Sequence, residues 1–315
     1  MSDDEHGSGG ESTFTVVLAF FANAGIALAK TVVALITGSA SMLAESAHSW
    51  ADTGNEVLLL VADKRSRRAP DESRPLGYGR EAYVWSMFAA MGLFVAGAVV
   101  SVWNGVTKLF ETSEDTSYFW AYVVLGIAFV LEGVSFAQAY RQTRREAHGL
   151  DRRVVEHALN TSDPTLRAVF AEDSAALAGL VIATLGIFLH QVTGDAAYDA
   201  VGSILVGILL GVVAVVLINR NRRFLVGQEA DPRVRAAAIE ALMENPEVAR
   251  VTYLRLEVVG PRMVTVIGDV DLVGDDTESQ LAVRLRALEA QISESPAVVG
   301  AVLSLSAPDE PTLVV

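Results

Sequence analysis

Six long apolar segments occupy most of the first 220 residues, at 14–37, 41–62, 82–110, 118–140, 165–190 and 196–219. Each has at least 22 residues, and an α-helix needs about 20 to cross the hydrocarbon layer of a bilayer. One such segment could be a buried helix of a soluble protein, but six in succession predict six transmembrane helices. The preceding residues 1–13 are acidic and rich in Gly and Ser, so we expect a disordered tail.

The pattern changes after Arg223, where alternating apolar and polar residues predict a small α+β domain. We expect helices at 233–245 and 277–293 and strands at 251–259, 262–272 and 297–306, with Gly260-Pro261 in a hairpin turn. The predicted fold is therefore an α-helical membrane protein with six transmembrane helices and a C-terminal α+β domain. Its predicted parts are the tail 1–13, a transmembrane domain at 14–223 and a cytoplasmic α+β domain at 231–315. That last domain could be a dimerisation domain or a regulatory module with no chemistry of its own.

Charge gives the expected orientation. Lys and Arg are concentrated in the connections after the second and fourth segments and after the sixth, and the connections 38–40, 111–117 and 191–195 have none. Cytoplasmic loops carry an excess of Lys and Arg, so both termini should face the cytoplasm. The formal net charge of −14 and pI near 4.8 argue against a nucleic-acid partner. No cysteine is present, which excludes disulfides and thiolate metal ligands.

The second segment carries a polar stripe within its apolar residues. Its spacings of 3, 7, 10 and 11 residues place all members on one side of a helix: Glu45, His48, Asp52, Asn55 and Glu56. His48 and Asp52 are one turn apart, so imidazole and carboxylate can reach one ion. The alternative is a hydrogen-bonded polar stripe between helices.

Further polar residues lie inside other segments, where charged side chains are costly and usually functional. Glu172 and Asp173 are adjacent in the fifth segment, so we expect only one to face the site. Lys30 could pair with an acid or reach outward. Asn23 and Glu132 could belong to a proton path or to helix packing, and Asp199 is explained by the favourable dipole at the start of the sixth helix.

These residues predict a divalent-cation site near the middle of the bilayer, built by the second and fifth helices. A His with carboxylates suits Zn²⁺, whereas an all-oxygen set would suit Mg²⁺ or Mn²⁺. We expect no prosthetic group.

The run from Gly38 to Thr53, GSASMLAESAHSWADT, resembles the second-helix signature of the cation diffusion facilitator family. The stretches Asp52–Glu56, Pro75–Gly79, Phe170–Ala176 and Tyr198–Ser203 are similar to the branch containing the mitochondrial zinc transporters. The resemblance covers nearly the whole chain, and it implies a metallochaperone-like fold for the C-terminal domain.

The resemblance implies a homodimer that carries divalent metals, commonly Zn²⁺, out of the cytoplasm in exchange for protons. It implies a transport site with two ligands from the second helix and two from the fifth, each pair spaced i, i+4. His48 and Asp52 match the first pair and Asp173 matches the second member of the other. Its first member falls on Val169, which cannot bind a metal, so Glu172 or water would complete the site. Glu45, Asn55, Glu56, Asn23 and Glu132 would support the site or a proton path.

Two other metal sites of that family have no counterpart here. The connection after the second segment reads Arg74-Pro75-Leu76-Gly77-Tyr78 without histidine, and the last histidine is His190, so the C-terminal domain has none. We therefore expect that domain to dimerise without binding zinc tightly, and its Asp269, Asp271, Asp275 and Asp276 to be solvated. His148 and His157 could collect cytoplasmic ions, but a solvated loop is the simpler interpretation.

The main hypothesis is a proton-coupled metal exporter in a bacterial-type plasma (inner) membrane, since the acidic N-terminus is unlike a basic transit peptide. Mn²⁺, Fe²⁺ or Co²⁺ are alternative cargoes. A non-transporting metal sensor is a second hypothesis, motivated by Val169. An intramembrane metallohydrolase is disfavoured because no His-Glu-x-x-His motif occurs.

Overall fold

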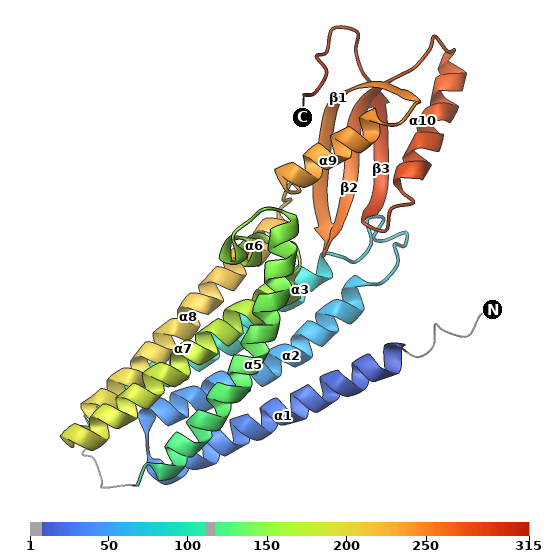
Figure 1. Cartoon of the computed structure of the whole chain (residues 1–315). Helices are drawn as coiled ribbons and strands as arrows, with labels where there is room; N and C mark the ends of the chain where they lie inside the picture. The colour runs from blue at the N-terminus through green and yellow to red at the C-terminus, as the bar shows by residue number, and fades with distance from the viewer. Residues whose placement is uncertain (1–7, 111–116, 315) are drawn as a thin grey trace. The chain divides into compact units, whose positions relative to one another are not determined.

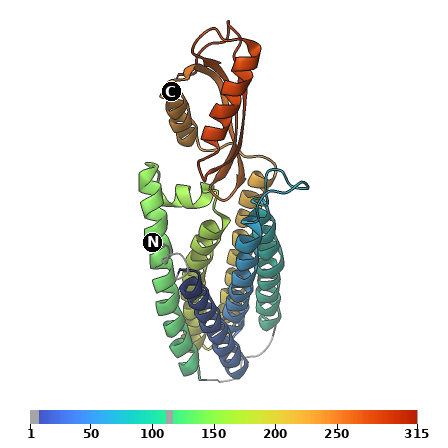
Figure 2. The same cartoon turned by 90° about the vertical axis from the view of Figure 1, so that its right-hand side faces the viewer.

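The computed structural model describes the backbone of residues 8–110 and 117–314, and side chains from residue 20 onward within these ranges. The long helices run alongside one another (Figures 1 and 2). They are α1 (Ser8–Thr37), α2 (Ala40–Ser66), α3 (Glu81–Ala89), α4 (Val95–Lys108), α5 (Phe119–Gly149), α7 (Pro164–Thr193) and α8 (Ala197–Leu225). α1 begins at Ser8 within the predicted tail, and residues 1–7 of that tail lie outside the described residues.

Two local features differ from the prediction. The third apolar segment is one continuous helix, but a π-helical turn, η1 (Ala90–Phe94), separates α3 from α4. Such turns are rare and widen the helix locally, and Ala90 and Phe94 are both buried there. The basic connection after α5 was predicted as a loop but contains the short helix α6 (Val154–Asn160).

Among the described residues, five helical segments are apolar and long enough to cross a membrane: 20–37, 81–108, 119–149, 164–193 and 197–225. α2 falls outside this set because Glu45, Asp52 and Glu56 lie in its central part. The predicted helical membrane fold with a C-terminal α+β domain is confirmed, and α2 is the least apolar of its long helices.

The chain forms two compact units. The first comprises residues 1–61, 85–159 and 165–219, as far as they are described, and the second comprises 62–84, 160–164 and 220–315. The second unit therefore contains the C-terminal domain together with the short segments 62–84 and 160–164. From the sequence, we expected these two segments to be part of the transmembrane domain.

The second unit contains a three-stranded sheet. β1 (Val248–Gly260) pairs antiparallel with β2 (Met263–Leu272), and β2 pairs parallel with β3 (Val298–Leu305). α9 (Pro232–Met243) packs on β1 and α10 (Glu278–Ile292) packs on β3. One hydrophobic core joins these elements through residues such as Ile239 of α9 and Leu288 of α10. The bounds of the predicted helices and strands agree with the structure to within about three residues.

The hairpin end of this sheet contacts the 62–84 segment. A Cβ on Gly79 would lie 2.5 Å from the carbonyl oxygen of Val259, so only glycine permits this approach. Arg80 Nη2 lies 2.5 Å from Glu257 Oε1, and the ring of Tyr83 stacks on Phe224 with centroids 4.9 Å apart. The Gly-Tyr-Gly stretch is therefore a packing element of the second unit.

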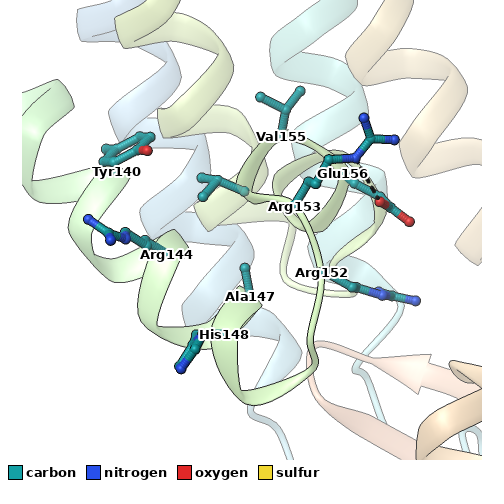
Figure 3. A pocket seen from close by; sticks show the side chains of 9 residues that line it. Tyr140, Arg144, Ala147, His148, Arg152, Arg153, Val155 and Glu156 are labelled. Carbon is teal, nitrogen blue, oxygen red and sulfur yellow. Dashed lines mark ion pairs between the residues drawn. The ribbon is translucent and has the colours of Figure 1, made fainter.

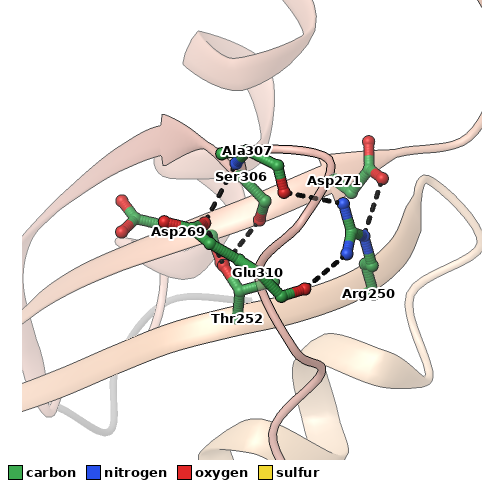
Figure 4. A network of polar contacts seen from close by, with 7 residues as sticks. All are labelled: Arg250, Thr252, Asp269, Asp271, Ser306, Ala307 and Glu310. Atoms are coloured by element: carbon green, nitrogen blue, oxygen red, sulfur yellow. Dashed lines mark hydrogen bonds and ion pairs between the residues drawn. The ribbon is translucent and has the colours of Figure 1, made fainter.

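The C-terminal segment is fastened to the sheet by Arg250 (Figure 4). Its guanidinium donates to Asp271 Oδ2 (2.9 Å) and to the carbonyl oxygens of Glu310 (2.7 Å) and Ala307 (3.0 Å). Asp276 pairs with Arg284 in the same domain. Asp271 and Asp276, which we expected to be solvated, are therefore held by arginines.

The loop between α2 and α3 is ordered by Asp71. Its carboxylate accepts hydrogen bonds from Tyr78 Oη (2.6 Å) and Ser73 Oγ (2.7 Å), and the Arg74 guanidinium lies 4.7 Å from the Tyr78 ring centroid. The hydrogen bonds from Tyr78 and then Ser73 lower the pKa of Asp71 to about 2, because they favour the ionised form.

The Tyr78→Phe variant should raise the pKa of Asp71 toward its ordinary value of 3.8. Asp71 then becomes protonated at a higher pH, because the largest interaction favouring its ionised form is gone. Carboxyl-detected NMR of the full chain labelled on aspartate would follow the titration. Tyr253→Phe, which removes a hydroxyl from β1, is the matched control, and an unchanged Asp71 titration in Tyr78→Phe would contradict the assignment.

Asp199 fixes the start of α2. It lies in the first turn of α8, as expected, but its carboxylate accepts from the backbone N–H groups of Ala40 (2.6 Å) and Ser41 (3.1 Å) and from Ser39 Oγ (2.8 Å). The interpretation that it only complements the dipole of its own helix is incomplete. Asp199 caps a helix that begins about 160 residues earlier in the chain.

The Asp199→Asn variant should lower the free energy of unfolding by about 2–3 kcal/mol, because an amide satisfies fewer of these donors and loses the charge. The carboxylate of the exposed Asp195 accepts a hydrogen bond from the Ala197 N–H (2.9 Å), so Asp195→Asn should cost under about 1 kcal/mol. Unfolding in detergent by tryptophan fluorescence measures both. Equal losses in the two variants would contradict the capping role.

Candidate metal centre

The polar stripe of α2 places His48 and Asp52 together. His48 Nε2 lies 3.4 Å from Asp52 Oδ2, and the imidazole is almost completely buried. Both ring nitrogens of His48 and Oδ1 of Asp52 are buried without a hydrogen-bond partner among the described residues. A buried polar atom without a partner is costly, so this pair is suited to accept a cation or a proton.

The two adjacent acids of α7 turn to different neighbours. Glu172 Oε1 accepts a hydrogen bond from Asn55 Nδ2 of α2 (2.5 Å). Asp173 Oδ2 accepts one from Ser135 Oγ of α5 (2.8 Å). Because neighbouring helical positions are about 100° apart, one acid joins α7 to α2 and the other joins it to α5.

Acidic side chains from two other helices lie near Asp52. Glu172 and Asp173 of α7 and Glu132 of α5 repel its charge. Several carboxylates in a low-dielectric region cannot all remain ionised unless cations or protons compensate them. The cluster therefore favours binding of positive charge.

Within the described part of the chain, no three His, Asp or Glu side chains converge at metal-binding distances. His48 and Asp52 are in contact, but Asn55 and Ser135 hold Glu172 and Asp173 in hydrogen bonds of their own. Val169, one turn before Asp173, is half-buried and provides no ligand. Binding of an ion by all four candidate ligands would require the α7 acids to leave these partners.

Glu45 and Lys30 form a buried ion pair between α2 and α1. Lys30 Nζ donates to Glu45 Oε2 (3.0 Å) and to Ser49 Oγ (2.8 Å), so Lys30 pairs with an acid and does not reach outward. Glu45 Oε1 is left without a hydrogen-bond partner in the described residues, and a Cβ on Gly179 of α7 would lie 2.5 Å from it. Gly179 therefore leaves the space that this carboxylate occupies.

Asn23 and Glu132 differ in their contacts. Asn23 Nδ2 of α1 donates to Glu56 Oε1 of α2 (2.5 Å), which is a packing contact between helices. Glu132 of α5 is partly buried near Asp52. Of the residues predicted as supporting groups, Glu45, Asn55, Glu56 and Asn23 each hold a hydrogen bond to a side chain of another helix.

The other histidines among the described residues lie away from this stripe. His157 of α6 is buried, with Nε2 3.3 Å from Glu146 Oε2, so the interpretation of a solvated loop is wrong for it. His190 is buried at the end of α7, where Nδ1 lies 3.2 Å from Tyr118 Oη. His148 is exposed on α5.

Sequence reasoning missed Ser135, Ser49 and Asp199 as partners. Ser135 and Ser49 are small hydroxyl residues inside apolar segments, and single hydroxyls are common in membrane helices. No periodic signal within one segment indicates which side chain of another helix such a residue will meet.

The profile of the cation efflux transmembrane domain matches residues 16–226, well over half of the chain. The chain belongs to the cation efflux family. The predicted resemblance to the cation diffusion facilitators is confirmed, and with it the expectation of a multi-pass membrane protein.

Comparison with individual proteins agrees with this family assignment. Metal tolerance protein C4 of Arabidopsis thaliana is 36% identical over 233 residues, which are 74% of this chain and 51% of that protein. The human mitochondrial proton-coupled zinc antiporter SLC30A9 is 33% identical over 240 residues, 76% of this chain and 42% of that protein. Magnetosome protein MamB of Paramagnetospirillum magneticum is 26% identical over 242 residues, 77% of this chain and 76% of that protein. The chain spans about half the length of the first two, and it lies near the branch of the mitochondrial zinc antiporters.

Proposed function

We propose that this protein carries Zn²⁺ across a membrane in exchange for protons, with the metal bound by His48, Asp52 and Asp173. The observation that carries the proposal is the buried His48–Asp52 pair. Both ring nitrogens of His48 lack hydrogen-bond partners in the described residues, and the two α7 acids repel the charge of Asp52. Imidazole and carboxylate oxygen are both Zn²⁺ ligands. The relationship to zinc antiporters supports the same cargo.

The exchange of metal for protons follows from the ligands. Imidazole and carboxylates bind a metal only when deprotonated, so binding expels protons and protonation expels the metal. We assign this exchange to His48 and the carboxylates beside it, because each can hold either a proton or the metal. Glu172 is the reserve ligand: release from Asn55 would let its carboxylate turn to the ion, and water would otherwise fill the place that Val169 leaves open.

The proposal includes the setting of the transporter. The concentration of Lys and Arg in alternate connections supports cytoplasmic termini, and we place the protein in a bacterial-type plasma membrane as a homodimer joined by its C-terminal domain. That domain contains no histidine, and Arg250 and Arg284 hold two of its acids. It is therefore proposed to dimerise without tightly bound zinc.

Zn²⁺ flux into proteoliposomes that contain a metal-sensitive dye should respond to an imposed pH gradient. Flux should vanish in Asp52→Ala and in Asp173→Ala, because each change removes a ligand of the transported ion. Asp195→Ala, which removes an exposed acid at a helix start, is the matched control and should transport normally.

Each contrary outcome has a distinct meaning. Zn²⁺ flux that ignores the gradient would remove proton coupling, and flux of only Mn²⁺, Fe²⁺ or Co²⁺ would change the cargo. Binding without flux of any of these ions, in liposomes shown to hold folded protein, would favour a metal sensor. That second candidate is motivated by Val169 and by the hydrogen-bonded acids of α7.

The Val169→Asp variant should bind Zn²⁺ about tenfold more tightly or better, a gain of at least ~1.4 kcal/mol. The new carboxylate lies one turn before Asp173 and can supply the fourth ligand of a tetrahedral site. Tighter binding should slow release and lower the maximal flux. Isothermal titration and the flux assay measure the two effects, Val169→Leu is the control, and unchanged affinity would place the site away from Asp173.

A further inference from the structure

A cavity of about 720 Å³ lies between the end of α5 and the turn that leads into α6, separate from the polar stripe of α2 (Figure 3). Four of its side chains come from α5 and the others come from the turn and α6. The lining includes Tyr140, Arg144, His148, Arg152, Arg153 and Val155.

The position of these residues along α5 places the cavity at the membrane surface. α5 starts at Phe119, so its first 20 residues span the hydrocarbon layer and Tyr140 follows at the boundary where tyrosine is enriched. With a rise of 1.5 Å per residue, Arg144 lies about 6 Å beyond Tyr140. That depth is the level of the lipid head groups.

The lining is basic in a chain of net charge −14. Arg144 and His148 are one turn apart on α5, project from it in Figure 3, and are both exposed. Neither forms an ion pair or hydrogen bond with a side chain among the described residues. Glu146, the acid between them in sequence, is near His157 (3.3 Å), so it does not neutralise them.

The opposite side of the cavity is partly apolar. Val155 is 59% exposed although it is aliphatic, and Val154 also lines the space. Arg153 is almost fully exposed and lies 3.8 Å from Glu156, the one acid of the lining. A basic side next to exposed aliphatic side chains matches a molecule with an anionic group and a hydrocarbon part.

We propose that this cavity binds the head group of an anionic phospholipid. The phosphate contacts Arg144 and His148, and the glycerol and first acyl carbons pack against Tyr140 and Val155. Basic pockets at this depth recognise anionic head groups through charge and hydrogen bonds, and the apolar part favours a lipid over a soluble phosphate. A lipid held here braces the α5–α6 connection, which leads into α7 and its two acids.

Native mass spectrometry of the full-length protein, released from nanodiscs that contain equal phosphatidylglycerol and phosphatidylcholine, tests the proposal. The unaltered protein should retain phosphatidylglycerol about tenfold over phosphatidylcholine. Arg144→Gln should lower that retention about tenfold, and Val155→Asp should abolish it by placing a negative charge in the apolar part. Arg145→Gln removes the same charge from an adjacent exposed residue outside the cavity and should leave retention unchanged.

Equal losses in Arg144→Gln and Arg145→Gln would overturn the proposal, because they would show attraction to surface charge in general. Equal retention of the two lipids would also overturn it. Displacement of phosphatidylglycerol by an equal concentration of soluble glycerol phosphate would show that the cavity binds a free anion. The readout is lipid retention, so a failed transport assay and a failed lipid assay are separate results.

Discussion

The cost of charge in hydrocarbon is the constraint on which the membrane unit depends. Each ionisable side chain at the bilayer centre costs roughly 2.5–3.5 kcal/mol on insertion scales, and the structure meets this cost by pairing. Lys30 holds Glu45 and Asn23 holds Glu56, joining α1 to α2, while Asn55 holds Glu172 and joins α2 to α7. The polar side chains therefore decide which helices lie together, since apolar faces pack on lipid almost as well as on each other.

His48 and Asp52 stand apart from this pairing. They contact each other at 3.4 Å, and three of their polar atoms are buried without hydrogen bonds in the described residues. Glu45 and Glu56 each hold a side chain of α1, whereas His48 and Asp52 pair only with each other in the described part of the chain. We therefore propose this pair as the place for a cation or a proton. The same constraint that holds the helices together therefore points to the site that we propose for the transported ion.

In the second unit, charged side chains hold the C-terminal segment and a loop in place. Arg250 ties the C-terminal segment to the sheet, and Asp71 orders the loop after α2 through Tyr78 and Ser73. Gly79 lets that loop approach the β1–β2 hairpin. Two acids that could have suggested a metal site in this domain, Asp271 and Asp276, are neutralised by arginines, which leaves the polar stripe of the membrane unit as the candidate metal centre.

The sequence alone determined the long helices, the order of strands and helices in the C-terminal domain, and the contact between His48 and Asp52. These depend on periodicity within one segment, where a spacing of four residues places two side chains on the same face of a helix. It did not indicate η1 or α6, which depend on local packing and not on hydropathy. Only the tertiary structure decided that Asp199 caps α2, that Ser135 holds Asp173 and that Glu172 turns to Asn55. Those contacts join residues between 38 and 159 positions apart, and a pattern within one helix carries no information about which other helix will lie against it.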